Sequence, residues 1–95
     1  MLFAIICTDK PGSLELRINT RPAHVEYLQS LGENLKAGGP FLGDDEKPCG
    51  SLIVVNADDM DAAQAIAADD PYAKAGLFEA VEIRAWNWIL KNPEN

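Results

Sequence analysis

The order of apolar segments in the sequence predicts an α+β domain of the ferredoxin-like type, with the element order β-α-β-β-α-β. Short runs rich in β-branched and aromatic residues, such as residues 2–8 and 51–56, have the length and composition of strands. Two other stretches carry apolar residues at spacings of three and four, which is typical of one face of a helix. Right-handed crossovers would place both helices on one face of a four-stranded antiparallel sheet.

The first half of the chain predicts a strand followed by a helix. The strand covers Leu2 to Thr8 and ends at the turn signal "DKPGS". Thr20 is expected to cap the helix, because Pro22 suits a first helical turn, and the glycines of "KAGG" at residues 36–39 are expected to end it. The apolar face of this helix is expected to carry His24, Tyr27, Leu28, Leu31 and Leu35.

The second half predicts a hairpin, a helix and a final strand. Pro40–Leu42 and Ser51–Asn56 are expected to pair across the polar loop "GDDEKPCG". Asp58 or Asp59 can cap the second helix, and Pro71 stops it. Its buried face is expected to carry Met60, Ala63, Ile66 and Ala67, and a long strand is expected from Leu77 to Leu90.

Length and composition limit the class of protein. The 95 residues, 47% of them apolar, are enough for one domain, which is expected to span residues 1–95. The apolar runs are far shorter than the roughly 20 residues of a membrane span, and the start lacks the features of a signal peptide. We therefore expect a cytoplasmic protein without a membrane partner. Its net charge of −7 disfavours nucleic acid as a partner. Cys7 and Cys49 are expected to be free thiols.

The last strand predicts an apolar sheet face that no helix covers. Val81, Ile83 and Ala85 are expected to face the helices, and Phe78, Trp86 and Trp88 to face the other side. Burial of such a face against a second copy would contribute several kcal/mol at about 25 cal/mol per Å². The sequence thus predicts a homodimer packed sheet to sheet. The alternative is that the tryptophans pack beneath the C-terminal residues of their own chain.

The only histidine of the chain is a candidate for general acid/base chemistry. A lone histidine on an apolar helix face is more often a packing residue. However, the expected position of His24 near the positive end of a helix favours a neutral imidazole, and a nearby carboxylate would fix its tautomer. Asp70 is a candidate for that carboxylate, because Pro71 biases it toward an extended backbone at a helix end where acids are disfavoured. The alternative for Asp70 is an Asp-Pro turn without further purpose.

Several motifs, in order, resemble one family of small proteins. They are "MLFAIICTDKPGSLELR" at the start, "RPAH" at residues 21–24, "GGP" at 38–40, "GS" at 50–51 and "ADDPYAKAGLFEAVEIRAW" at 68–86. Together they resemble the YciI-like proteins (YCII-related domain). The resemblance implies a dimeric α/β barrel and a histidine–aspartate site, His24 and Asp70, with Ser51 and Arg21 as neighbours. Gly38 departs from the family pattern, which more often has alanine, and the hairpin loop is shorter than in some relatives.

These observations lead to a functional hypothesis. His24, oriented by Asp70, is expected to act as a general base on a small anionic or phenolic substrate, in an elimination or isomerisation. Some YciI-like proteins are assigned dehydrohalogenation of aromatic compounds, which the resemblance makes relevant here. No nucleotide fingerprint or metal-ligand cluster is present, so no cofactor or metal is expected. A hydrolase fits less well, because the chain lacks a nucleophile elbow.

The remaining candidate residues would bind the substrate. Arg17 and Arg21, with the amides at the start of the first helix, would hold its negative group; their alternatives are surface solubility or pairing with Glu15 or Glu26. Ser51 could donate a hydrogen bond or simply begin a strand, and Tyr72 could line a pocket or lie on the surface. The rival hypotheses are a dimer that binds a small metabolite without turnover, and a purely structural partner protein.

Overall fold

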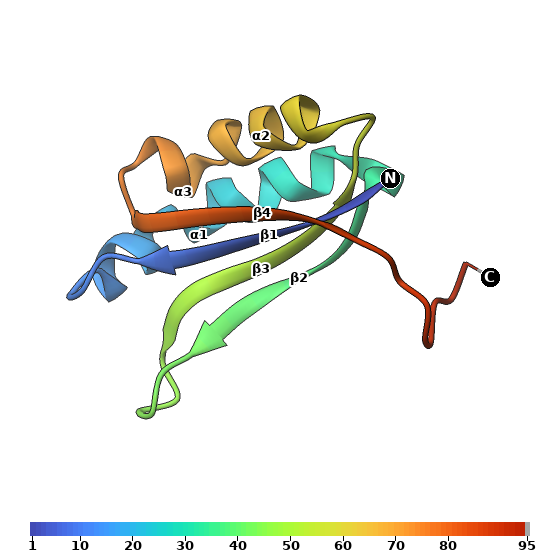
Figure 1. The fold of residues 1–95 in the computed structure, drawn as a ribbon. Helices are drawn as coiled ribbons and strands as arrows, with labels where there is room; N and C mark the ends of the chain where they lie inside the picture. The colour runs from blue at the N-terminus through green and yellow to red at the C-terminus, as the bar shows by residue number, and fades with distance from the viewer. Residues whose placement is uncertain (95) are drawn as a thin grey trace.

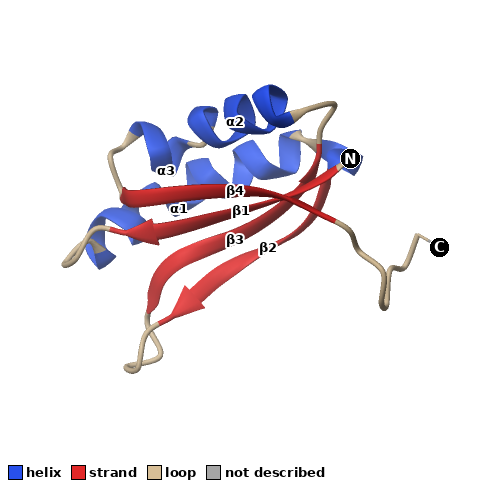
Figure 2. Cartoon of the chain, in the orientation of Figure 1, coloured by secondary structure: helices blue, strands red, loops and turns tan. Residues whose placement is uncertain are grey.

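Four antiparallel strands form one sheet in the part of the chain that the structure describes, with the α-helices packed on one of its faces (Figures 1 and 2). The structure is a computed structural model that describes residues 1–94, so residue 95 of the predicted domain lies outside the described residues. The sheet order is β2-β3-β1-β4, which confirms the predicted ferredoxin-like α+β fold. The elements are β1 (Leu2–Asp9), α1 (Leu14–Ser30), the 3₁₀ turn η1 (Gly32–Asn34), β2 (Leu35–Leu42), β3 (Pro48–Asn56), α2 (Met60–Asp69), α3 (Pro71–Lys74) and β4 (Phe78–Trp86).

The core lies between the sheet and the helices. Alternate residues of β1 point toward the helices and are buried, and their partners in β3 continue the same layer. Leu28 of α1 and Ala63 of α2 pack on this layer from the helix side. The buried residues of this core are Phe3, Ile5, Cys7, Leu28, Ile53, Val55 and Ala63.

Helix α1 begins at Leu14, so Thr20 lies inside the helix and is not its cap as predicted. Pro22 also lies inside the helix, and His24 lies near its middle. The reason is visible in the residues of its inner face. Helical spacing of apolar residues is kept by Leu14, Ile18, Val25 and Leu28. Arg17, Arg21 and His24 lie between them and interrupt the apolar stripe, so the sequence does not show where the helix begins. The expected effect of the helix dipole on His24 therefore does not apply at this mid-helix position.

The end of α1 was also predicted too late. Ser30 is its last residue, and Gly32 takes the left-handed conformation (φ 59°) that commonly follows a helix end. The "KAGG" segment instead belongs to β2, which starts at Leu35 and pairs with β3 through Leu42. Gly38 lies close against the side chain of Ile53 there, where a Cβ atom would stand 3.3 Å from Ile53 Cδ1.

Strand β4 ends at Trp86, so the predicted end at Leu90 is wrong. The structure also corrects the expected positions of Phe78 and Trp88. A bulge opposite Thr8 and Asp9 shifts the pairing, so Phe78 pairs with Asp9 and packs against the core on the helix side. Phe78 is thus not on the open face. Trp88 lies beyond the strand, where its ring contacts Trp86 at a centroid distance of 5.6 Å. The predicted orientation of Val81 and Ile83 toward the helices is confirmed, since they pair with Cys7 and Ile5.

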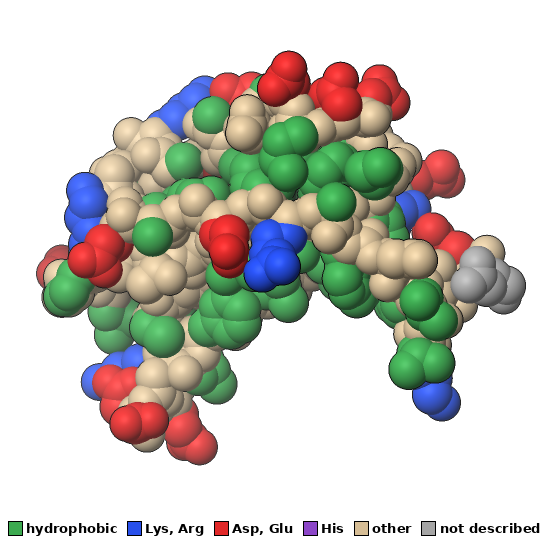
Figure 3. All heavy atoms as spheres, in the orientation of Figure 1, with side chains coloured by type: hydrophobic (Ala, Val, Ile, Leu, Met, Phe, Trp, Pro, Cys, Tyr) green, Lys and Arg blue, Asp and Glu red, His purple; other side chains and the backbone are tan. Residues whose placement is uncertain are grey.

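The face of the sheet opposite the helices carries apolar side chains. Figure 3 shows this face as a hollow between the β2–β3 hairpin and the C-terminal segment, with hydrophobic side chains along it. Leu52 and Trp86 lie on it and are 37% and 43% exposed. The C-terminal residues do not bury the two tryptophans: Trp86 is exposed and Trp88 is only partly buried. Trp88 Nε1 donates to the carbonyl of Leu90. No helix in residues 1–94 is long and apolar enough to cross a membrane.

Candidate active site

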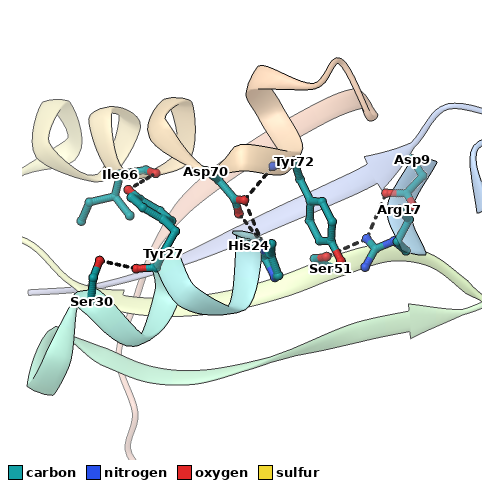
Figure 4. Close-up of polar contacts among 9 residues, drawn as sticks. All are labelled: Asp9, Arg17, His24, Tyr27, Ser30, Ser51, Ile66, Asp70 and Tyr72. Atoms are coloured by element: carbon teal, nitrogen blue, oxygen red, sulfur yellow. Dashed lines mark hydrogen bonds and ion pairs between the residues drawn. The ribbon is translucent and has the colours of Figure 1, made fainter. Parts of the chain in front are cut away.

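His24 and Asp70, which are 46 positions apart, meet between α1 and the junction of α2 and α3 (Figure 4). The Nδ1 atom of His24 lies 2.8 Å from Oδ1 and 3.0 Å from Oδ2 of Asp70. Because a carboxylate only accepts, the hydrogen of a neutral ring lies on Nδ1. The second nitrogen, Nε2, is then an unprotonated acceptor, and no described residue is recorded as hydrogen-bonded to it. Both side chains are largely buried, so water competes weakly for this contact.

The position of Asp70 follows from its local sequence. It ends α2 and caps α3, and its extended backbone (φ −60°, ψ 128°) separates the two helices. Its Oδ1 accepts a hydrogen bond from the backbone nitrogen of Tyr72 at 2.9 Å. Pro71 takes the first position of α3, where its missing N–H is not needed. The Asp-Pro turn and the histidine contact are therefore both present, and the turn aims the carboxylate at His24.

Tyr72 forms one wall of the imidazole site. Its ring stacks on His24 with centroids 3.9 Å apart and planes 18° from parallel, and it is 1% exposed. The guanidinium of Arg17 lies 4.6 Å from the centre of the same ring, so Tyr72 stands between Arg17 and His24 (Figure 4). Phe78 meets Tyr72 edge to face. These contacts leave the His24 ring little freedom to rotate.

A second buried ion pair lies beside the first. Arg17 donates to Asp9 from Nε at 2.7 Å and from Nη2 at 3.0 Å, and Nη2 also donates to Ser51 Oγ at 2.8 Å. Burial alone would lower the pKa of Arg17, but the hydrogen bond and charge of Asp9, with Tyr72, raise it above its ordinary value. The partner of Arg17 is thus Asp9, not Glu15. Asp9 gives no functional signal in the sequence, because an acid before a Pro-Gly turn is ordinary.

A cleft of about 560 Å³ opens beside His24, between α1 and the β2–β3 hairpin. Its walls include five of the six predicted site residues: Arg17, Arg21, His24, Ser51 and Tyr72. The sixth, Asp70, lies behind His24 and contacts its Nδ1. Lys47 of the hairpin loop also lines the cleft and was not predicted. Most of the remaining wall is apolar, as small-molecule sites commonly are.

Two other ionisable groups near the site stay protonated at neutral pH. Burial, with the nearby charges of Asp70 and Asp9, raises the pKa of the Cys7 thiol to about 12. Burial also raises the pKa of Tyr72, although the charges of Arg17 and Arg21 oppose this. Neither group is a nucleophile poised at neutral pH. Residues 1–94 do not bring three metal-ligating side chains together.

The fold and the cleft define a class of small ferredoxin-like proteins with a histidine–aspartate contact beside an apolar cavity. The sequence model of the YCII-related domain family matches residues 1–87, so the chain belongs to that family. It is 39% identical to "Protein YciI" of Escherichia coli O6:H1 over 98 aligned residues, which cover 95% of this chain and all of that protein.

Two solved structures extend the comparison. The 5-chloro-2-hydroxyhydroquinone dehydrochlorinase of Burkholderia phenoliruptrix, solved in complex with 2,5-dihydroxybenzoquinone, is 39% identical, with a TM-score of 0.85 over 92% of this chain and 94% of that one. SnoaB of Streptomyces nogalater, a cofactor-independent oxygenase, is 11% identical, with a TM-score of 0.57 over 96% of both chains. The second likeness shows the shared fold alone. The first connects a close relative to a small quinone ligand.

The two ion pairs of the protein that differ most in burial should differ in their effect on stability. Asp9→Asn leaves the buried Arg17 charge without its partner, and we expect it to lower the free energy of unfolding by about 3 kcal/mol. Lys36→Gln breaks an ion pair to the half-exposed Glu94 and should cost under about 1 kcal/mol. Urea denaturation followed by tryptophan fluorescence measures both. Equal losses for the two variants would contradict the assigned contribution of the Asp9–Arg17 pair.

Proposed function

We propose that the protein is a cofactor-independent enzyme that uses His24 and Asp70 for general acid/base chemistry on a small anionic or phenolic compound. The observation that carries this proposal is the contact of His24 Nδ1 with Asp70 at 2.8 Å beside an open cleft. A carboxylate that fixes the tautomer and stabilises the imidazolium makes the opposite nitrogen a competent base. From the sequence alone, His24 could be a packing residue or a general base. The contact with Asp70 beside the cleft supports the role of general base.

The proposed reaction is a proton transfer coupled to elimination or isomerisation. Nε2 of His24 takes a proton from the substrate, and Asp70 stabilises the imidazolium that forms. The electron pair left on the substrate either expels a leaving group or moves to form a new double bond. In the isomerisation, the imidazolium returns its proton to another substrate atom; in the elimination, it releases the proton to solvent. Ser51, buried and held by Arg17, is close enough to the cleft to contact developing charge.

The relatives support an activity on small molecules in general. The dehydrochlorinase that is 39% identical acts on a chlorinated hydroxyhydroquinone, as its name states, and was solved with a dihydroxybenzoquinone. Elimination of chloride from a phenolic ring is one form of the chemistry proposed here. A hydrolase has less support, since the buried Ser51 contacts Arg17 in the structure and no contact with His24 is recorded.

Replacement of either member of the pair should greatly reduce turnover without unfolding the protein. With 5-chloro-2-hydroxyhydroquinone as the first compound tested, His24→Gln and Asp70→Asn should each lower kcat by about 10²-fold or more. Asp69→Asn removes the neighbouring exposed carboxylate and should leave kcat unchanged. Chloride release and the absorbance of the product measure the rate.

The same experiment distinguishes the non-catalytic alternative. If the native protein binds quinones or phenols by calorimetry but turns over none of a panel of phenolic and acidic compounds, the binding dimer is the better account. If His24→Gln turns over substrate at the native rate, the proposed mechanism is wrong.

We also propose that a second copy of the chain covers the open sheet face, as in a dimeric α/β barrel. Supporting this, Leu52 and Trp86 on that face remain more than a third exposed. Phe78, expected there from the sequence, is not part of the surface, since it packs on the helix side.

A charge placed on the open face should separate the copies. Leu52→Glu is expected to sediment as a monomer, and the native chain at twice its 10.3 kDa mass. Leu16→Glu is the matched control, because Leu16 on α1 is also 37% exposed, and it should stay dimeric. Sedimentation velocity at micromolar concentration makes the comparison. A native monomer, or a dimeric Leu52→Glu, would contradict the proposed interface.

A further inference from the structure

The cleft beside His24 has the opposite charge to the rest of the protein. The chain carries fifteen acidic and eight basic residues. Yet, apart from the histidine, the charged side chains that line the cleft are all cationic: Arg17, Arg21 and Lys47. The two carboxylates of the site, Asp9 and Asp70, lie outside this lining. The cleft therefore attracts anions to a protein that otherwise repels them.

The three cations are not equivalent. Arg17 is 5% exposed, and Asp9 holds it in two hydrogen bonds, so its charge is already balanced. Arg21 and Lys47 are exposed, and neither forms an ion pair with any described residue. Arg21 comes from α1, one turn before His24, and Lys47 comes from the β2–β3 hairpin. Two positive charges without an ion-pair partner among the described residues thus reach the cleft from different elements.

The loop before β3 fixes the backbone of Lys47. The carbonyl of Lys47 accepts from the backbone nitrogen of Gly43 at 2.9 Å, and its own nitrogen donates to Asp45 Oδ1 at 3.0 Å. Glu46 takes a left-handed conformation (φ 64°) to close the turn. The three acids of this loop, Asp44, Asp45 and Glu46, do not line the cleft. The loop therefore contributes Lys47 to the lining of the cleft and none of its carboxylates.

The apolar part of the cleft indicates the rest of the ligand. Leu14, Ile18 and Val25 of α1 face Pro40 and Pro48 of the hairpin strands across it. These apolar walls suit a flat ring better than a polar chain such as a sugar. The stacked pair of His24 and Tyr72 forms the inner end.

We propose that Lys47 is a specificity residue that, with Arg21, binds the acidic group of a ring compound whose apolar body lies between α1 and the hairpin. The substrate class is then an aromatic or quinonoid anion, carrying a carboxylate or an ionised hydroxyl. This proposal rests on the proposed function for the location of the site. It does not depend on turnover, because binding alone tests it.

The test is equilibrium binding to His24→Gln protein, in which loss of catalysis cannot affect the result. Benzoate and 2,5-dihydroxybenzoquinone are the anionic probes, and benzamide is the neutral counterpart of benzoate. Calorimetry at low salt should show at least one anion binding more tightly than benzamide. Adding Lys47→Gln or Arg21→Gln should weaken binding of that anion by about threefold to tenfold and leave benzamide unchanged. Adding Lys74→Gln, an equal charge change on α3 outside the cleft, should have little effect.

Three results would overturn the proposal. They are equal affinity for benzamide and for both anions, no binding of any probe at millimolar concentration, and a loss for Lys47→Gln no larger than for Lys74→Gln. A catalytically inactive native protein that still gave the expected affinities would defeat the proposed function and leave this inference intact.

Discussion

The contact between His24 and Asp70 joins the two halves of the chain, and the proposed chemistry of the cleft depends on it. His24 comes from the middle of α1, and Asp70 comes from the break between α2 and α3. The break exists because Pro71 cannot continue α2, and Asp70 then caps the short helix that follows. One residue therefore ends a helix, starts another and holds the imidazole. A carboxylate at this helix end would otherwise be unfavourable.

The surrounding residues hold this contact in place. Tyr72 follows Asp70 by two positions, and its ring lies against His24 on one side and near Arg17 on the other. Arg17 is in turn fixed by Asp9 at the end of β1 and by Ser51 in β3. The sheet, α1 and α3 thus meet in one network, and no fully buried side-chain nitrogen or oxygen of the described residues lacks a hydrogen-bond partner. Such a network is costly to disturb and keeps side chains in one geometry.

Much of the fold was predictable from the sequence because β1, β3 and α2 have clear apolar periodicity. The start of α1 was not, since Arg17, Arg21 and His24 occupy the face that apolar residues normally mark. The bulge that turns Phe78 toward the helices leaves no mark in the alternation of β4. The His24–Asp70 pair was predictable from an acid at an unfavourable helix end together with the family motifs. Asp9 and Lys47 were not, because their partners and position depend on tertiary structure.

The most direct test of this account is the protonation of the His24 ring itself. His24 is the only histidine in the chain, so a nitrogen-15 NMR spectrum of ring-labelled protein reports one imidazole. We predict that the neutral ring carries its hydrogen on Nδ1, with a downfield proton signal that Asp70→Asn removes or shifts. A neutral ring protonated on Nε2, or a spectrum that Asp70→Asn leaves unchanged, would contradict it.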